Sequence, residues 1–181
     1  MNKSNLKQVV LYVVAAIFII SIPLYMILTN AFVLEDGVEF LFKVEAFDPY
    51  DMFRGNYLDI NFKEDTVEGE FEDYPVDDNS QVYVLIEKDK DGFAYFSDIS
   101  ITKPKDTKMY YKTNVRYNEN LKSAIVETPT RYYINEDKAL DAEKIYRENL
   151  DNTYVKVRVK EGQMVIVGVY INDKLIDSLV E

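Results

Sequence analysis

The chain has 181 residues, with 32 acidic and 21 basic side chains, a net charge of −11, and neither histidine nor cysteine. The missing residue types exclude histidine acid–base catalysis, Cys–His nucleophiles, Cys/His zinc sites and disulfides. The acidic balance argues against a nucleic-acid partner, which requires a basic footprint. The length suits one domain of ordinary size with a short appendage.

The appendage is an apolar N-terminal segment. No charged residue lies between Lys7 and Glu35, and residues 9–28 are almost wholly apolar. At about 1.5 Å per residue, this stretch spans about 30 Å, the thickness of a hydrocarbon core. A signal peptide would have a shorter apolar region of about 7–15 residues and a better cleavage site. The sequence predicts an uncleaved signal-anchor helix over residues 9–30, in contact with the lipid bilayer.

The charge distribution predicts the orientation of this span. Lys3 and Lys7 precede it, whereas 19 bases and 32 acids follow residue 34, a net charge of −13. Basic residues near a span stay on the cytoplasmic side. We expect a single-pass protein of the cell membrane, with a cytoplasmic tail (1–8), a linker (31–38) and an extracytoplasmic domain (39–181).

The expected domain is built mainly of strands. Alternating apolar residues and turn signals predict strands at 39–47, 57–62, 82–86, 93–101, 109–117, 124–126, 131–134, 154–159 and 164–171. Residues 88–92 and Glu161-Gly162 are hairpin turns. The acid-rich residues 64–78 are expected to form a solvated loop or hairpin tip.

One soluble helix is expected, over Glu136 to Glu148. Asn135 can cap its start, and acidic residues follow in the first turn. Ala139, Ala142, Ile145 and Tyr146 form a modest apolar stripe. The predicted fold class is α+β: mainly antiparallel β, as a barrel or sandwich, with one inserted helix, after an N-terminal transmembrane helix.

The segment from Asp48 to Gly55 is a turn rich in specialised residues. Its Asp-Pro pair opens a turn, and Asp48 or Asp51 could hold Arg54 in a forked ion pair. Gly55 supplies a positive φ or a close approach. The turn is either a recognition loop, with Arg54 binding an anionic group or a partner carboxylate, or a self-satisfied turn that sets strand register.

The residues after this turn carry a family resemblance. Gly55-Asn56-Tyr57-Leu58-Asp59-Ile60-Asn61-Phe62 resembles the motif of the GDYXXLXY family, and the segment 131–136 (Arg-Tyr-Tyr-Ile-Asn-Glu) resembles its second signature. The resemblance implies a bacterial, membrane-anchored protein without an assigned activity. By association, it also implies a multi-span membrane protein as partner. The candidate binding residues are Asp48, Asp51, Arg54, Gly55, Tyr57, Arg131, Tyr132 and Glu136.

The departures from the motif favour structure over catalysis. Asn56 stands where the family has aspartate, and it cannot act as an acid or base. Ile60 replaces leucine, and Phe62 replaces the last tyrosine and lacks its hydroxyl. The changes at residues 56 and 62 keep the shape of the side chain while losing its chemistry.

No metal, cofactor or catalytic residue is predicted. Residues 89–92 (Asp-Lys-Asp-Gly) resemble the start of a calcium loop but lack its later ligands, so a turn is expected. The acids between Glu68 and Asp78 could attract divalent cations, but a solvated loop explains them. No serine lies in a recognisable nucleophile motif.

The leading hypothesis is therefore a non-enzymatic accessory or interaction module for another membrane protein. One alternative is an envelope hydrolase that uses carboxylates, with Asp48 or Asp51 and Glu136 as the acid pair. Another is an extracytoplasmic ligand-binding sensor, which would need a partner for output because the cytoplasmic tail is short.

Overall fold

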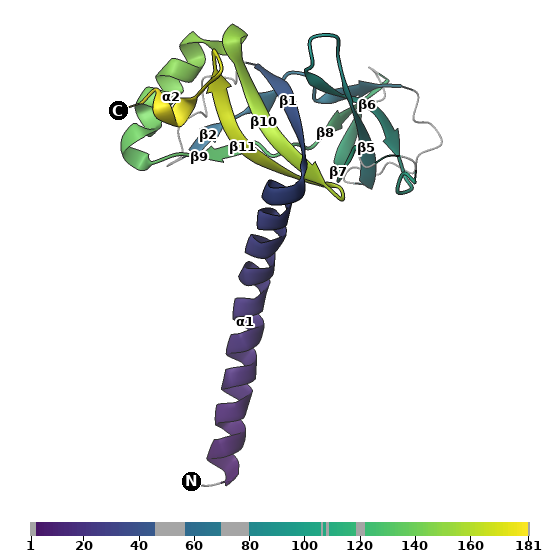
Figure 1. Cartoon of the computed structure of the whole chain (residues 1–181). Coiled ribbons are helices and arrows are strands. Elements are labelled where there is room, and N and C mark those ends of the chain that lie inside the picture. The colour runs from purple at the N-terminus through teal and green to yellow at the C-terminus, as the bar shows by residue number, and fades with distance from the viewer. Residues whose placement is uncertain are drawn as a thin grey trace.

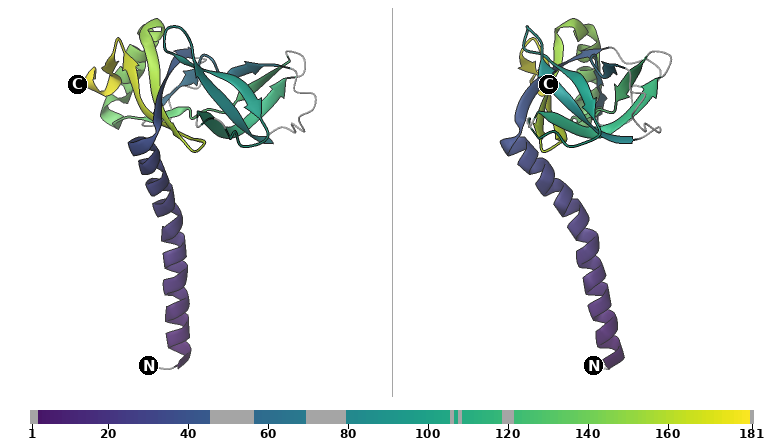
Figure 2. Two further views of the ribbon diagram at one scale, coloured as in Figure 1. Left: turned by 45° about the vertical axis from the view of Figure 1, so that its right-hand side comes forward. Right: turned by 90° about the vertical axis from the view of Figure 1, so that its right-hand side faces the viewer.

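The computed structural model describes residues 3–45, 57–69, 80–105, 107, 109–118 and 122–180. A long N-terminal helix carries a β-rich domain on its C-terminal end (Figure 1). The two further views in Figure 2 show the same separation, with the helix projecting from one side of the domain. The predicted fold class, a mainly antiparallel β domain with one inserted helix after an apolar N-terminal helix, is confirmed.

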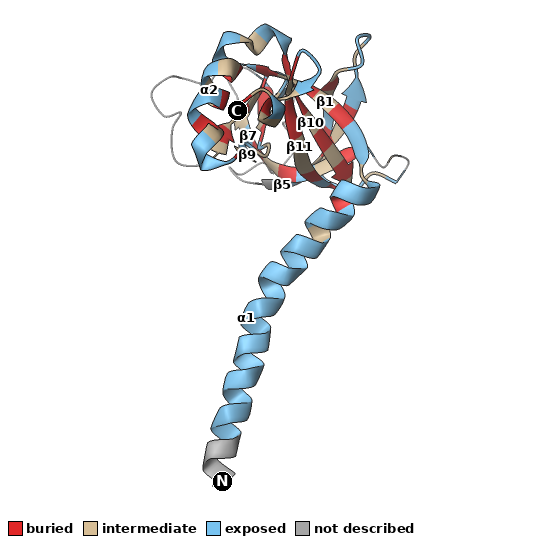
Figure 3. Cartoon of the chain, turned by 60° about the vertical axis from the view of Figure 1, so that its left-hand side comes forward, coloured by how far each residue is buried: buried red, intermediate tan, exposed pale blue. Residues whose placement is uncertain are grey.

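The helix α1 (Lys3–Asp36) is long and apolar enough over residues 7–36 to cross a membrane. No residue of its apolar window is buried, so α1 is not a core helix of the domain (Figure 3). The helix continues through residues 31–36, which the sequence analysis assigned to a linker. Only Gly37 separates α1 from the strand β1 (Val38–Glu45).

The first sheet has five antiparallel strands around β1 and β10. Val155, Val157 and Val159 alternate inward along β10, as their spacing predicts. Along β1, Phe40 stands opposite Val157 and Phe42 opposite Val155. The strand order is β12 (Lys174–Leu175), β11 (Gln163–Ile171), β10 (Thr153–Lys160), β1 and β3 (Asn61–Phe62).

The second sheet is also antiparallel and nearly closes into a barrel. Its order is β4 (Thr66–Glu68), β8 (Ser123–Val126), β7 (Tyr110–Asn118), β5 (Ser80–Lys88) and β6 (Ala94–Ser100). The outer strands β4 and β6 contact each other, which brings the sheet close to closure. A bridge between Tyr111 and Gly162 joins this sheet to the β10–β11 turn.

The helix α2 (Glu136–Glu148) has the predicted bounds. The Asn135 side chain accepts a hydrogen bond from the Asp137 amide, and Ala139, Ala142 and Tyr146 are buried. The short 3₁₀ helix η1 (Leu150–Asn152) follows it in the chain, and a second one, η2 (Ile176–Ser178), contacts it in space. Local capping and apolar spacing thus determine the bounds of α2.

The alternating segment 57–62 forms two strands rather than one. Leu58, Ile60 and Phe62 are all buried, as predicted. However, β2 (Tyr57–Asp59) pairs with β9 (Arg131–Tyr133), whereas β3 pairs with β1. At the change of partner, the Ile60 amide donates to the Thr130 carbonyl at 2.7 Å.

The acid-rich stretch also differs from its prediction as a loop. Thr66–Glu68 forms β4, paired with β8, and Val67 between them is buried. This short strand lies at the edge of the second sheet, and Val67 is its one residue that faces the core. Residues 70–79 lie outside the described residues.

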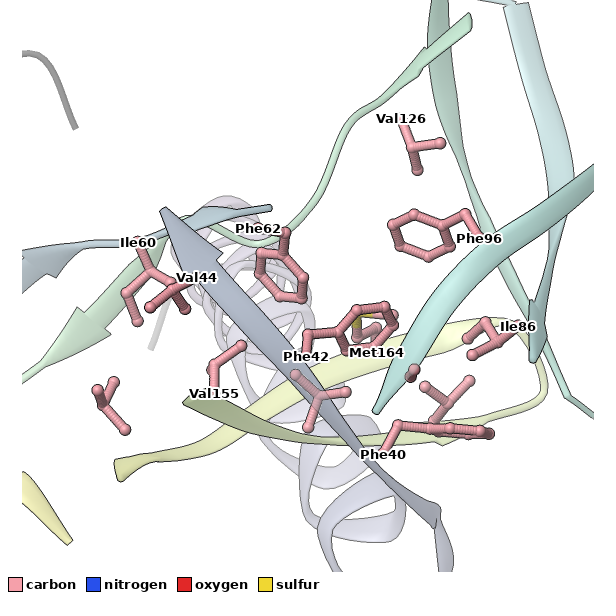
Figure 4. Packing of buried hydrophobic residues seen from close by; sticks show 14 of the residues in the cluster. Phe40, Phe42, Val44, Ile60, Phe62, Ile86, Phe96, Val126, Val155 and Met164 are labelled. Carbon is pink, nitrogen blue, oxygen red and sulfur yellow. The ribbon is translucent and has the colours of Figure 1, made fainter. Parts of the chain in front are cut away.

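The core is a continuous apolar cluster that joins both sheets. Phe42 of β1 lies with its ring centroid 5.0 Å from that of Phe62 and 5.2 Å from that of Phe96. Figure 4 shows these rings converging from β1, β3 and β6, with Met164 and Val155 beside them. Because Phe42 contacts rings from both sheets, the sheets share one core.

Candidate functional site

The two family-like segments of the sequence meet in space as the ribbon formed by β2 and β9 (Figure 1). Tyr57 stands opposite Tyr133, Leu58 opposite Tyr132, and Asp59 opposite Arg131. Because side chains alternate along each strand, the outer pairs of the ribbon share one face, and the central pair, Leu58 and Tyr132, points to the other. The first face carries Tyr57, Asp59, Arg131 and Tyr133.

The outward face carries a tyrosine that contacts a second tyrosine and an arginine, which we call the Tyr57 cluster (Tyr57, Arg131 and Tyr133). The rings of Tyr57 and Tyr133 meet edge to face with centroids 5.9 Å apart. The Arg131 guanidinium carbon lies 5.0 Å from the Tyr57 ring centroid. Tyr133 is 64% exposed. The cluster therefore presents two phenols and a guanidinium at the surface, with the Asp59 carboxylate opposite Arg131 on the same face.

Tyr132 faces inward and is bonded to a residue that the sequence analysis missed. Its hydroxyl donates a short hydrogen bond to Oδ2 of Asp177 in η2. Burial, followed by the bond to Asp177 and its negative charge, raises the pKa of the Tyr132 phenol above its ordinary value. Tyr132 thus fastens the ribbon to the C-terminal segment and lies apart from the outward cluster.

Glu136 lies at the exposed first turn of α2. A carboxylate there is favoured by the positive end of the helix dipole. The predicted residues Asp48, Asp51, Arg54 and Gly55 lie outside the described residues. The ion pair expected between Arg54 and the two acids, and the acid pair expected with Glu136, remain predictions.

A cleft of about 550 Å³ lies elsewhere in the domain, beyond the reach of sequence reasoning. Its wall includes Lys43, Phe93, Asp151, Tyr154 and Asp173, which come from five separate elements or turns. No short motif links these positions, so only the tertiary structure brings them together.

The Tyr154 side chain in this cleft is held by two contacts. Its ring stacks on Tyr170 with centroids 5.5 Å apart, and its hydroxyl donates to Oδ1 of Asp173 at 2.9 Å. Burial and the bond to Asp173 raise the pKa of Tyr154 to about 12. The phenol is therefore a neutral hydrogen-bond donor at ordinary pH.

The hairpin at the cleft edge accounts for the calcium-like residues. Asp89 Oδ1 accepts hydrogen bonds from the amides of Asp91 at 2.9 Å and Phe93 at 2.8 Å. Although partial burial opposes ionisation, these bonds and Lys43, whose Nζ is 3.4 Å away, lower the pKa of Asp89. Asp89 closes its own turn, and within the described ranges no three acidic side chains gather as a metal site.

Comparison with known proteins gives one informative result. Neither the curated proteins nor the solved structures contain a significant match. The family model for the GDYXXLXY protein matches residues 19–169, a region that includes both strands of the ribbon and most of the domain. This match covers most of the chain, and the chain therefore belongs to the GDYXXLXY family.

Proposed function

We propose that this protein is a single-pass, membrane-anchored, extracytoplasmic module that binds another membrane protein and catalyses no reaction itself. The Tyr57 cluster carries this proposal, because it combines an exposed arginine with one exposed and one half-buried aromatic ring on a buried scaffold. Tyrosine and arginine are enriched in protein–protein interfaces, where they combine contact area with directed hydrogen bonds.

The anchor supports the membrane part of the proposal. α1 is apolar, exposed and long enough to cross a bilayer, and basic residues precede its apolar stretch. Its last turn packs into the domain, where Val33 is 2% exposed. A partner in the same membrane would meet a domain held at a short, fixed distance from the bilayer.

The scaffold beneath the cluster supports a recognition role. Leu58 is buried beneath β2, and the Tyr132 hydroxyl is bonded to Asp177 beneath β9. These contacts fix both strands, so the outward side chains lose little further freedom on binding. The cluster offers donors, a cation and aromatic surface, which suit binding to a carboxylate or carbonyl of a partner.

Site-specific photo-cross-linking in intact membranes tests the proposal. A photoreactive phenylalanine at Tyr133 should cross-link to an integral membrane protein, and Arg131→Ala in the same chain should abolish the product. The matched control places the same reagent at Leu140 on α2, since Leu140 is 65% exposed and Tyr133 is 64% exposed. Equal products at both positions, or a product that survives Arg131→Ala, would contradict the proposal.

A further inference from the structure

The surface around the end of α1 differs from the rest of this acidic domain. Three exposed apolar side chains lie on segments at this end: Val38, Ile101 and Met109, which are 40%, 48% and 47% exposed. We call this surface, together with Lys103, Lys105 and Lys160, the collar. The other large apolar side chains exposed in the described domain, Tyr133 and Leu140, lie on β9 and α2.

The three lysines of the collar line one pocket. This pocket of about 340 Å³ has Val38 and Val159 in its wall, and the acids Asp36 and Glu161 also line it. Lys160 Nζ is 2.6 Å from Asp36 Oδ2 and is thereby neutralised. Among the described residues, Lys103 and Lys105 form no ion pair within 4 Å. Lys105, and Lys103 with the Glu161 carboxylate in its vicinity, therefore remain as the cations for an anionic ligand.

Lys103 is held in place by an aromatic neighbour. Its Nζ lies 5.8 Å from the ring centroid of Tyr110, a residue that is 3% exposed. The hydrogen bond with the Tyr110 hydroxyl, followed by its partial charge, raises the pKa of Lys103 above its ordinary value. The ammonium group stays charged at any physiological pH.

The Lys160 end of the collar lies at the depth of lipid headgroups. If residues 9–28 fill the hydrocarbon core, each headgroup layer beyond it is about 6 Å thick, or roughly four helical residues. The β10–β11 turn descends to this level beside α1. Lys160, Glu161 and Gln163 share a hollow of about 260 Å³ with Thr29 and Phe32, among other residues of α1.

The contacts between the end of α1 and the domain limit how far the domain can tilt relative to the helix. Arg158 donates to the carbonyls of Leu34 and Glu35, and Gly37 donates to the Val33 carbonyl at 2.9 Å. Lys160 Nζ also lies 5.4 Å from the Phe32 ring centroid. The domain is thus fastened to α1 on the side where the collar lies.

We propose that the collar seats on the leaflet from which α1 emerges, with Lys103 and Lys105 binding the phosphate of an anionic phospholipid headgroup. Ile101 and Met109 enter the interfacial layer beside it. Lysine stems cover apolar surface while their ammonium groups meet phosphate, and basic groups near an anionic surface are attracted to it. This inference rests on the membrane anchoring proposed above.

The chain contains no tryptophan, so one introduced tryptophan reports depth without background. The full-length Ile101→Trp variant is reconstituted in phosphatidylcholine vesicles that carry brominated acyl chains, with and without phosphatidylglycerol. Fluorescence should be quenched strongly only when phosphatidylglycerol is present. Met109→Trp is the second reporter if Ile101→Trp misfolds. Lys90→Trp, at the tip of the β5–β6 hairpin, is the control and should stay unquenched.

Charge variants in the Ile101→Trp background test the two lysines. Lys103→Gln with Lys105→Gln should remove most of the quenching. The matched pair Lys90→Gln with Lys144→Gln, exposed lysines on the hairpin and on α2, should leave it unchanged. Quenching that is equal in both lipid mixtures, or unaffected by the first pair, overturns headgroup binding.

Two further arms separate the remaining outcomes. Inorganic phosphate is compared with chloride at equal ionic strength: a greater loss of quenching in phosphate would support recognition of the phosphate group, whereas equal loss in both salts would overturn it. Flotation of the vesicles after an alkaline wash tests the anchor itself. A chain that fails to float contradicts the proposed function, whereas a chain that floats without quenching at residue 101 contradicts only the collar.

Discussion

Arg158 of β10 donates through Nη1 to the main-chain carbonyl of Glu35, at 3.1 Å, and also to that of Leu34. These carbonyls lie in the last turn of α1, where a helix has no further amides of its own to donate to them. A strand from the far end of the sequence therefore caps the helix that precedes the domain. The contact explains how α1 and β1 can be joined through Gly37 alone.

Arg158→Ala should loosen this junction. The substitution removes a cationic donor from the negative end of α1, a loss of about 1 kcal/mol for an exposed contact. Hydrogen exchange of the full-length protein in micelles should show faster exchange at Gly37 and Val38, with little change in β5. Arg116→Ala, at an exposed arginine of β7, is the control. Unchanged exchange at residues 37 and 38 would show that the cap contributes nothing.

Gly37→Ala tests the closeness of the same junction. A Cβ at residue 37 would lie 2.3 Å from the Val33 carbonyl oxygen and 3.0 Å from the Cβ of Arg158. Main-chain atoms cannot move aside cheaply, so unfolding should become easier by about 2 kcal/mol or more. The comparison is Gly92→Ala: its Cβ meets nothing within 4 Å, and only its φ of +87° is unfavourable, at a cost of about 1 kcal/mol. Thermal unfolding of both variants measures the difference, and equal losses would refute the steric argument.

Local signals explain which parts of the fold could be predicted. The α2 bounds follow from Asn135, the acids after it and the apolar stripe, all of which lie within one segment. Inward alternation along β10 is equally local. The change of partner at Ile60 is not, because it depends on Thr130 and on β1, which the pattern of residues 57–62 cannot reveal.

The candidate site likewise has residues that the sequence could identify and residues that it could not. Tyr57, Arg131 and Tyr132 could be identified from the sequence, since they belong to recognisable motifs. The separation of Tyr132 from the outward face could not, because strand register determines which residues share a face. Asp177 was missed because it lies 45 positions beyond Tyr132 and belongs to no motif.

Tyr132→Phe should change stability in a pH-dependent manner. The pKa of Tyr132 is raised in the folded protein, so its neutral form is favoured there. A group with a raised folded pKa contributes stability below its unfolded pKa, about 10 for tyrosine, and loses it as the pH rises further. The variant should be less stable by about 1 kcal/mol near neutral pH, because Asp177 loses a donor. The deficit should shrink above pH of about 10.

Urea unfolding across this range measures the effect. Tyr133→Phe is the control, since Tyr133 is 64% exposed on the opposite face of the ribbon. A deficit in Tyr132→Phe that stays constant into alkaline solution would contradict the role of the Tyr132–Asp177 bond.

Phe42→Ala should lower the free energy of unfolding more than Arg158→Ala, Gly37→Ala or Tyr132→Phe. Phe42 is fully buried and contacts Phe62 from the first sheet and Phe96 from the second. Truncating a buried phenylalanine costs about 3–5 kcal/mol, whereas Leu140→Ala on the surface should stay within about 0.5 kcal/mol. Because the ring joins the two sheets, amide protection in β6 and β10 should fall by the same amount. A loss confined to one sheet would mean that the two sheets unfold as separate units and that the ring contacts do not couple them.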